Sequence, residues 1–383
     1  MTDKYPVDKA WMRRALELAA RGEGFVEPNP MVGCVIVRDG QKVGEGFHGR
    51  YGGPHAEIEA LRSLESKELA RDATAYVTLE PCCHVGKTPP CSQALIDAGV
   101  KRVVAAVRDP FPKVDGGGIR HLRSAGIECE TGLLEAEAKQ LLAPYLKKVT
   151  RGLPWVIAKW AMTLDGKIAT VAGESQWISG ELSRRHVHRL RGRVDAIIAG
   201  SGTIVADDPM LNARLPEEDR SRLARTATRV VLCRRTIPSL RSRVFQTASE
   251  IPTLVYASGE ADPDALQKIA ALGAEILTIE TKSDDESTEL VDECLRDLGN
   301  RGMTNVMLEG GPGILASFLS SSHQGMPGAI DEWHAYIGAK VFAGPAPGPI
   351  AGNGIANLVD APSLQLRSVD RFEDDVRLVY RRC

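Results

Sequence analysis

Short apolar runs separated by amphipathic stretches recur along the chain and predict alternating strands and helices. In the N-terminal part, the apolar run Ala73–Leu79 predicts a buried strand, and the periodic run His55–Leu64 after Pro54 predicts a helix. A second helix is expected to begin near Pro90 and Cys91. The order helix, strand pair, helix, strand, helix, strand indicates a three-layer α/β sandwich.

The pattern changes near residues 150–154, where a predicted helix over Glu135–Val149 is followed by RGLP and then by the apolar run WVIAKWAM. We therefore predict two domains, residues 1–150 and 151–383. In the second, strands alternate with helices as in parallel βα units. The strands are expected at Val194–Gly200, Arg229–Leu232, Pro252–Ala257, Ala274–Ile279 and Asn305–Glu309, and solvated helices at Gly259–Leu272 and Asp284–Leu298.

Composition agrees with a two-domain enzyme, since 383 residues exceed one ordinary hydrophobic core. Hydrophobic residues make up 43% and charged residues 26%, with a formal net charge of -2, so no global charge attracts nucleic acid or membranes. The apolar runs are too short to span a bilayer, and MTDKYPVDKA lacks a secretory signal's apolar core. The eight cysteines show no disulfide framework. We expect a cytoplasmic protein.

The most specific chemical pattern is His55 and Glu57, followed by Cys82 and Cys91. One imidazole and two thiolates fill three tetrahedral positions of zinc and leave the fourth for a water, as in catalytic zinc sites. Glu57 is expected to shuttle protons, because zinc deaminases use the glutamate of H-x-E in that way. Each residue alone also fits an ordinary structural position, and we expect the adjacent Cys83 not to be a ligand.

In the second domain, LEGGPGIL at Leu308–Leu315 follows a predicted strand and begins a predicted helix. Backbone amides at Gly310, Gly311 and Gly313 suit a pyrophosphate at a helix N-terminus, although such a turn is equally often a tight connection. The turn lacks the full G-x-G-x-x-G fingerprint with its later acidic residue, so a Rossmann domain is disfavoured.

The longer motifs resemble one family, the bifunctional deaminase/reductase of riboflavin biosynthesis. PNPMVGCVIV, GEGFH, GGPHAEIEAL, AYVTLEPC and GKTPPCSQALIDAGVKRVV are similar to its deaminase half, including the long cysteine spacing. KWAMTLDGKIAT, GESQWIS, HRLRGRVDAIIAGSGTIVADDPML and VMLEGGPGIL are similar to its reductase half. The resemblance implies a cytidine-deaminase-like three-layer α/β/α domain followed by a dihydrofolate-reductase-like α/β domain.

The resemblance also implies the cofactors Zn²⁺ and NADPH and two successive reactions. The first is hydrolytic deamination of 2,5-diamino-6-ribosylamino-4(3H)-pyrimidinone 5′-phosphate, and the second is reduction of its ribosyl group to ribityl. By resemblance, the NADPH contacts are Ala161, Trp177, Thr203, Asp207 and Gly311. The substrate contacts are Asn29, Ser175, Arg191, Leu211, Arg214 and Glu309. A homo-oligomer formed through the reductase domain is compatible with the resemblance, and no nucleic-acid or membrane partner is expected.

Two departures from the family pattern are present. Cys83 stands where serine is common, and Cys233 and Arg234, followed by Arg235, stand where aspartate and serine are common. The two arginines either favour NADPH over NADH through its 2′-phosphate or are simply solvated. Two rival functions also remain: a nucleic-acid-editing deaminase with an accessory domain, and a deaminase whose C-terminal domain senses a nucleotide without turnover. The long cysteine spacing and the lack of a basic, aromatic-rich stripe disfavour the first.

Overall fold

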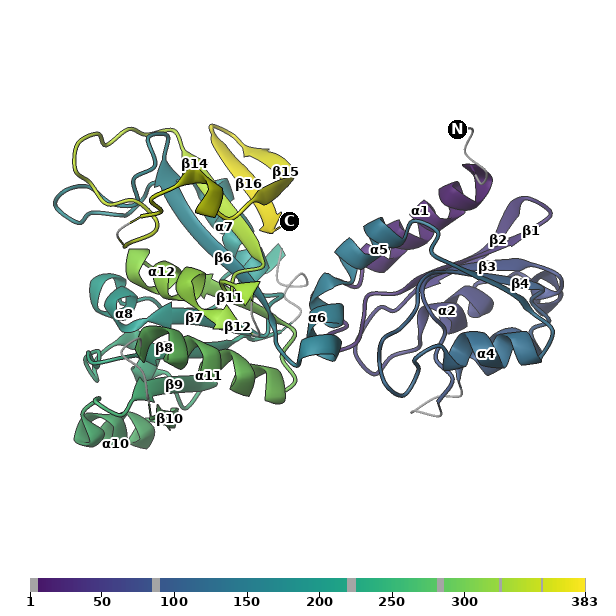
Figure 1. Cartoon of the computed structure of the whole chain (residues 1–383), viewed down its shortest axis with the longest axis horizontal. Coiled ribbons are helices and arrows are strands. Elements are labelled where there is room, and N and C mark those ends of the chain that lie inside the picture. The colour runs from purple at the N-terminus through teal and green to yellow at the C-terminus, as the bar shows by residue number, and fades with distance from the viewer. Residues whose placement is uncertain are drawn as a thin grey trace. The chain divides into compact units, whose positions relative to one another are not determined.

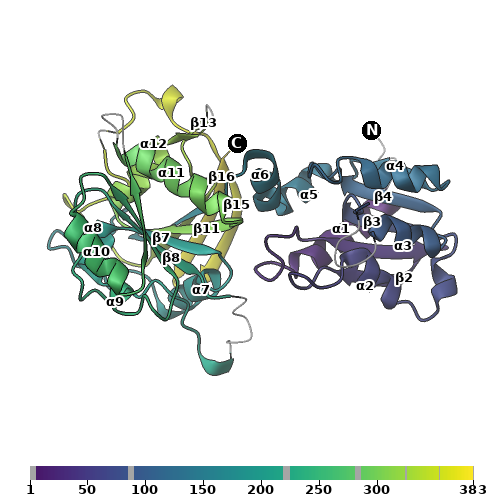
Figure 2. The ribbon, with the colours of Figure 1, turned by 90° about the horizontal axis from the view of Figure 1, so that it is seen from below.

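The computed structural model describes residues 6–84, 90–218, 225–280, 286–323, 326–352 and 354–382. The chain divides into two compact units, Met1–Gly152 and Leu153–Cys383; the sequence analysis placed this boundary between residues 150 and 151. Figures 1 and 2 show the helices and strands of each unit. Within the described ranges, no helix has the length and apolar character needed to cross a membrane.

The first unit is built on a five-stranded sheet with the order β2-β1-β3-β4-β5, in which β1 is antiparallel to β2 and β3 and the remaining pairs are parallel. The strands are β1 (Gly33–Arg38), β2 (Gln41–Phe47), β3 (Thr74–Leu79), β4 (Arg102–Val107) and β5 (Glu128–Thr131). The helices are α1 (Pro6–Ala20), α2 (Ala56–Arg62), η1 (Lys67–Ala70), α3 (Cys91–Asp97), α4 (Gly117–Ser124), α5 (Glu135–Leu141) and α6 (Ala143–Arg151).

Helices cover both faces of this sheet, because side chains alternate between the faces of a strand. Ile36 and Ala75 face a core formed with α2, α3 and α4, whereas Val35 and Tyr76 face a core formed with α1 and α5. The predicted three-layer α/β/α sandwich is therefore confirmed. The single helix predicted over Glu135–Val149 is wrong, since it divides into α5 and α6. Pro144, in the first turn of α6, accounts for the break because it has no backbone N–H to continue the preceding helix.

The second unit contains a nine-stranded sheet with the order β10-β9-β8-β7-β11-β6-β14-β16-β15. Neighbours from β10 to β14 run parallel, as predicted, whereas β16 is antiparallel to both β14 and β15. The strands are β6 (Trp155–Thr163), β7 (Ala196–Gly200), β8 (Thr228–Cys233), β9 (Thr253–Ser258), β10 (Glu275–Ile279), β11 (Asn305–Glu309), β14 (Glu332–Gly338), β15 (Leu364–Phe372) and β16 (Asp375–Arg382).

The helices of this unit are α7 (Glu181–Arg191), α8 (Ser201–Asp207), α9 (Arg243–Gln246), α10 (Pro263–Ala271), α11 (Glu286–Asn300), α12 (Pro312–Ser320) and η3 (Leu358–Asp360), and the short strands β12 (Ser322–His323) and β13 (Met326–Pro327) pair separately. Leu295 of α11 and Phe318 of α12 belong to the core on one face of the sheet, and Phe245 of α9 and Ile269 of α10 belong to the core on the other. Residues 284 and 285, the predicted start of the α11 region, lie outside the described residues.

Candidate deaminase and reductase sites

The predicted zinc ligands come together at the start of two helices. His55 immediately precedes α2, Cys91 is the first residue of α3, and Cys82 lies in the segment after β3. His55 Nδ1 lies 3.6 Å from Cys82 Sγ and 3.2 Å from Cys91 Sγ, and the three ligand atoms all lie within 4.8 Å of one another. Ligand atoms around tetrahedral zinc are separated by roughly 3.3–3.8 Å. The cluster therefore fits the ion that its donor atoms favour.

The local backbone also stabilises a thiolate. The backbone N–H of Cys91 donates a hydrogen bond to Cys82 Sγ over 3.3 Å. Hydrogen bonds from the Cys91 thiol and from His55 lower the pKa of Cys82 well below its usual range. The neighbouring Cys83 is not part of the three-residue cluster, and its Sγ donates to the carbonyl of Lys113. This geometry agrees with the expectation that Cys83 is not a ligand.

The loop that holds Cys82 is fixed by a buried carboxylate. Glu80 is 4% exposed and accepts hydrogen bonds from the backbone N–H groups of Asp109, Gly116 and Ile119, over 3.3, 3.2 and 3.0 Å. The first turn of α4 packs tightly on the same loop, because a Cβ at Gly118 would lie 1.9 Å from the carbonyl oxygen of Pro81. These contacts position the Cys82 backbone.

Glu57 lies in the first turn of α2 and is only 3% exposed. Burial, followed by the charge of Cys82, raises the pKa of Glu57 to about 7. A carboxyl group with this pKa can both accept and donate a proton near neutral pH, as a proton shuttle must. The structure thus places a poised carboxyl group beside the cluster of His55, Cys82 and Cys91.

The side chain of Asn29 is hydrogen-bonded to His48, which the sequence analysis did not identify as a site residue. His48, 2% exposed, has Nδ1 at 2.8 Å from the carbonyl of Pro54 and Nε2 at 3.2 Å from Asn29 Nδ2. A carbonyl only accepts hydrogen bonds, so the proton of neutral His48 is on Nδ1, and Nε2 accepts from Asn29. This orients the Asn29 amide. The ring of His48 also lies 5.4 Å from that of His55, which places Asn29 near the zinc cluster. The motif GEGFH, which ends at His48, is the sequence feature from which this histidine could have been identified as a site residue. Residues 86–89 of the adjoining motif GKTPPC lie outside the described residues.

In the second unit, a cavity of about 1290 Å³ opens along the carboxyl ends of the parallel strands. Ligands of open α/β sheets characteristically bind at this edge, and the volume exceeds that of an ordinary drug-sized pocket. All ten residues assigned to this domain by resemblance line the cavity: Ala161, Ser175, Trp177, Arg191, Thr203, Asp207, Leu211, Arg214, Glu309 and Gly311. Pro347, in the glycine- and proline-rich segment 343–356, also lines it.

A buried ion pair occupies one part of this cavity. Arg191 Nε lies 2.5 Å from Glu309 Oε1 and Arg191 Nη2 lies 2.7 Å from Glu309 Oε2, with side-chain exposures of 13% and 11%. Despite the cost of burial, the charge and hydrogen bonds of Arg191 hold the pKa of Glu309 at about 2. Arg191 is therefore largely buried, although it is the last residue of helix α7, which is rich in arginine. Glu309 thus occupies the guanidinium fork of Arg191, whereas the guanidinium of Arg214 hydrogen-bonds only the neutral side chain of Asn212 among the described side chains.

The pairing of β6 with β11 places Lys159 next to Glu309 in the wall of this cavity. Glu309 of β11 pairs with Lys159 of β6, which lines the cavity. Burial and the charge of Arg191 lower the pKa of Lys159, although Glu309 acts in the opposite direction. Nearby, the backbone N–H of Gly311 donates to Thr203 Oγ1 over 3.3 Å, so the glycine turn before α12 is tied to the start of α8. Two of the expected NADPH contacts are therefore mutually ordered.

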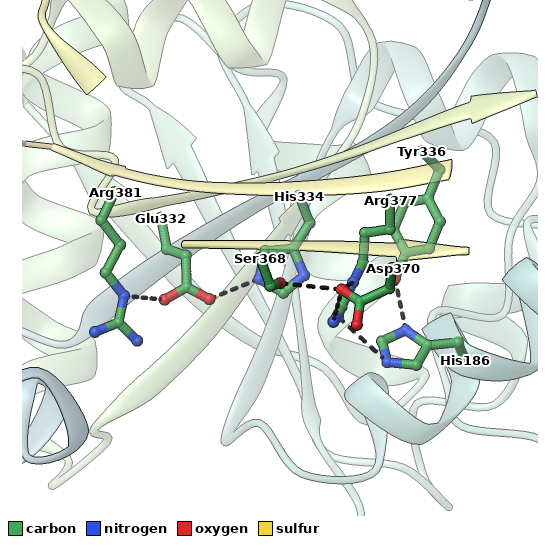
Figure 3. Close-up of polar contacts among 8 residues, drawn as sticks. All are labelled: His186, Glu332, His334, Tyr336, Ser368, Asp370, Arg377 and Arg381. Atoms are coloured by element: carbon green, nitrogen blue, oxygen red, sulfur yellow. Dashed lines mark hydrogen bonds and ion pairs between the residues drawn. The ribbon is translucent and has the colours of Figure 1, made fainter. Parts of the chain in front are cut away.

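Helix α7, which carries Arg191, is anchored to the sheet by a buried polar network (Figure 3). His186 Nδ1 lies 2.7 Å from the Tyr336 hydroxyl, and Arg377 Nη1 donates to His186 Nε2 over 3.2 Å. Arg377 is in turn paired with Asp370 at 2.8 Å. Protonated His186 would place an N–H against the Arg377 donor, and burial together with this charge lowers the pKa of His186 to about 4.

Stability of the second unit should therefore fall as the pH drops from about 6.5 to about 4. Burial also lowers the pKa of His188 to about 4, and both histidines have an ordinary pKa of 6.5. In this window the unfolded chain binds protons that the folded chain does not, so acid favours unfolding. Glu309 and Glu332, with pKa values of about 2, lose their stabilising charge only at lower pH, between 4.5 and about 2.

Urea unfolding followed by tryptophan fluorescence measures this effect, because four of the five tryptophans lie in residues 153–383. The His186→Gln variant should show a shallower pH dependence between about pH 6.5 and 4. An unfolding free energy that stays constant across this window in the unmodified protein would contradict the prediction.

Comparisons with known proteins match both units. Residues 6–107 match the family model described as the cytidine and deoxycytidylate deaminase zinc-binding region, and residues 154–378 match the RibD C-terminal domain. The chain is 40% identical to riboflavin biosynthesis protein RibD of Actinobacillus pleuropneumoniae over 98% of its length and 96% of that protein. It is 39% identical to RibD of Escherichia coli K12, with coverages of 97% and 98%.

Solved structures show the same similarity over both units. Acinetobacter baumannii RibD, form 1, superposes with a TM-score of 0.83 at 36% identity, covering 99% of this chain and 100% of the other. A Thermotoga maritima diaminohydroxyphosphoribosylaminopyrimidine deaminase/5-amino-6-(5-phosphoribosylamino)uracil reductase superposes with a TM-score of 0.80 at 35% identity, with complete coverage of both chains. This chain therefore belongs to the RibD family of riboflavin biosynthesis and combines a zinc-binding deaminase domain with a reductase domain.

Proposed function

We propose that the chain deaminates 2,5-diamino-6-ribosylamino-4(3H)-pyrimidinone 5′-phosphate and then reduces the ribosyl group of the product with NADPH. The observation that supports this most directly is the pairing of two sites in one chain. The first unit holds the His55, Cys82 and Cys91 cluster beside a buried Glu57, and the second holds a large cavity lined by charged side chains. The chemistry thus requires zinc in one unit and a dinucleotide in the other.

In the deaminase step, His55, Cys82 and Cys91 would hold zinc. When bound, zinc supplies a nucleophilic water by lowering its pKa toward neutrality. Glu57 accepts a proton from this water and delivers protons to the ring nitrogen and to the leaving amine, so that ammonia departs. The Asn29 amide, oriented by His48, binds the pyrimidine. One water is consumed and one ammonia is released.

In the reductase step, NADPH would, when bound, supply a hydride to C1′ of the ring-opened imine form of the ribosylamine, whose C=N bond becomes a single bond as the nitrogen takes up a proton. Ala161, Trp177, Thr203, Asp207 and Gly311 hold the cofactor, and Ser175, Arg191, Leu211, Arg214 and Glu309 hold the substrate. Arg214 binds the phosphate, whereas Arg191 keeps Glu309 ionised and aligned with the cavity. Lys159, which lines the cavity and is paired in register with Glu309, hydrogen-bonds the sugar oxygens.

Mass-resolved product analysis tests this function. Purified, zinc-replete protein is mixed with the diaminopyrimidine ribosylamino phosphate, with and without NADPH. We expect deamination alone without NADPH and the ribityl product when NADPH is present. Deaminated product that persists with NADPH would contradict the reductase role and favour a nucleotide sensor. Unchanged substrate in both reactions would contradict the substrate assignment.

A further inference from the structure

Residues 208–214, which follow α8, form a loop with a strained backbone, here called the substrate loop. By resemblance it carries two substrate contacts, Leu211 and Arg214, and both line the cavity of the second unit. Asp208 and Leu211 have φ angles of 39° and 46°, in the left-handed region that residues other than glycine seldom adopt. Leu211 is also 2% exposed. A backbone of this kind persists only where the surrounding groups hold it in place.

Two arginines hold the first part of the substrate loop. The backbone N–H of Arg243 donates to Asp208 Oδ1 over 2.7 Å, and Arg243 Nε donates to the Asp208 carbonyl over 2.7 Å. Nη1 of the fully buried Arg229 donates to the carbonyl of Met210 over 3.5 Å. These contacts anchor the backbone as far as Met210, just before the two substrate contacts.

Helix α7 holds the second part of the substrate loop. The backbone N–H of Arg214 donates to His188 Nδ1 over 3.1 Å, and Arg191 Nη1 donates to the carbonyl of Asn212 over 3.3 Å. Arg191 Nη1 also lies 3.5 Å from the same ring nitrogen of His188. Both groups that face Nδ1 can only donate, so the proton of the neutral ring is on Nε2. His188 therefore supplies the acceptor that fixes the Arg214 backbone.

The charges around His188 keep its ring in this neutral form. Burial, followed by the charges of Arg191 and Arg214, lowers the pKa of His188 to about 4. Glu309 and the carbonyl of Asn212 act in the opposite direction. At neutral pH the Nδ1 lone pair is therefore available, and the Arg214 backbone occupies it. This nitrogen acts on the loop and not on a reacting atom.

We infer that His188 is a positioning residue for the reductase substrate, because it holds the Arg214 backbone and so keeps Leu211 and Arg214 facing the cavity. This role rests on the proposed function, since it assumes that the substrate binds these two residues. Without the acceptor, the strained backbone at Leu211 loses one of the contacts that hold it. The loop then relaxes, and the substrate has to restore its conformation on binding.

Hydrogen–deuterium exchange of the substrate-free, zinc-replete protein, resolved to single amides, tests the hold on the loop directly. His188→Leu should raise the exchange rate of the Arg214 amide by about three- to tenfold, the usual net contribution of one hydrogen bond. His188→Asn should restore slow exchange, because its Oδ1 is bonded to Cγ, as Nδ1 is in histidine, and accepts the same N–H. His188→Gln, whose oxygen lies one bond further out, should restore less.

Steady-state reduction of the deaminated substrate by NADPH tests the consequence for binding. His188→Leu should raise the substrate KM by about three- to tenfold and leave kcat nearly unchanged, since the contact is lost equally in the ground state and the transition state. His188→Asn should recover the KM. His186→Leu is the matched control, because His186 lies on the same helix but contacts Tyr336 and Arg377 instead of the loop (Figure 3). It should lower stability without raising the KM.

Unchanged amide exchange and KM in His188→Leu would overturn this role. A KM in His188→Asn as high as that in His188→Leu would do the same, because packing of the ring and not its acceptor would then matter. An equal rise in KM in His186→Leu would assign the effect to the stability of α7. If the unmodified protein does not reduce the deaminated substrate, the proposed function fails, whereas the exchange rates still decide whether His188 holds the loop.

Discussion

Replacing Glu57 with glutamine is expected to lower the rate of deamination by about 10²–10⁴-fold, the usual contribution of a positioned acid–base group. Glutamine has the same shape but cannot accept a proton from water or pass one to a leaving amine. Glu57 is 3% exposed and its pKa is raised to about 7, so the unmodified side chain titrates near neutral pH. The substitution removes this titration while keeping the packing of α2.

The measurement is the rate of ammonia release from the diaminopyrimidine substrate, together with zinc content by elemental analysis. Zinc should stay bound, because His55, Cys82 and Cys91 are unchanged. Glu59→Gln is a matched control on the same helix, since Glu59 is partly exposed and pairs with Arg62 at 2.9 Å. Reduction of the deaminated substrate by NADPH should be unchanged in both variants. Deamination by Glu57→Gln within tenfold of the unmodified rate, with zinc bound, would show that another group moves the protons.

The zinc cluster was predictable because its residues are close together in the sequence. Pro54 before His55 and Pro90 before Cys91 mark the starts of α2 and α3. The two ligands therefore lie beside the backbone N–H groups of the first helical turns. The tautomer of His48 and the clamp at Glu80 were not predictable, because each depends on backbone groups brought in by folding. A sequence pattern can therefore identify ligands without the contacts that position them.

The fold class of both units was predicted from the apolar runs, but strands β14 to β16 were not. Their inward-facing residues include Glu332, His334 and Arg377, which a hydrophobic pattern assigns to a surface. Figure 3 shows these side chains in two groups of polar contacts: His334 Nε2 lies 2.6 Å from Glu332 Oε1, and Glu332 also pairs with Arg381, whereas Arg377 contacts Asp370 and His186. These polar side chains can be buried because they pair with other polar groups. The hydrophobicity of single residues does not predict such pairing.

The Arg191–Glu309 pair illustrates the same limit at the reductase site. The two residues are 118 positions apart, and only the folded sheet shows that Arg191 gives its fork to Glu309, whereas the guanidinium of Arg214 contacts the neutral side chain of Asn212. The family resemblance identified both residues as substrate contacts. The sequence alone does not show that Arg191, and not Arg214, forms an ion pair with Glu309. The electrostatics of the cavity therefore had to come from the structure.

Replacing Arg191 with methionine is expected to destabilise the second unit by about 3–5 kcal/mol, the usual result of removing one partner of a buried ion pair. Glu309, 8% exposed, would be left ionised without its counter-ion or would have to take up a proton. Urea unfolding by tryptophan fluorescence measures the loss. Exchanging both residues, Arg191→Met with Glu309→Leu, should restore most of the stability, because two apolar side chains leave no unpaired charge.

An exposed ion pair provides the matched control. Arg296 and Glu293 are paired on α11 with side-chain exposures of 54% and 45%, so Arg296→Ala should cost at most about 1 kcal/mol. The single and double variants at Arg191 should both lose NADPH-dependent reduction, since Glu309 is no longer held in its ionised form beside Lys159. A single variant as stable as Arg296→Ala would show that Lys159 alone compensates Glu309. In that case the role of Arg191 would be limited to geometry, and the pKa of Glu309 would be set by the lysine that β6 brings beside it.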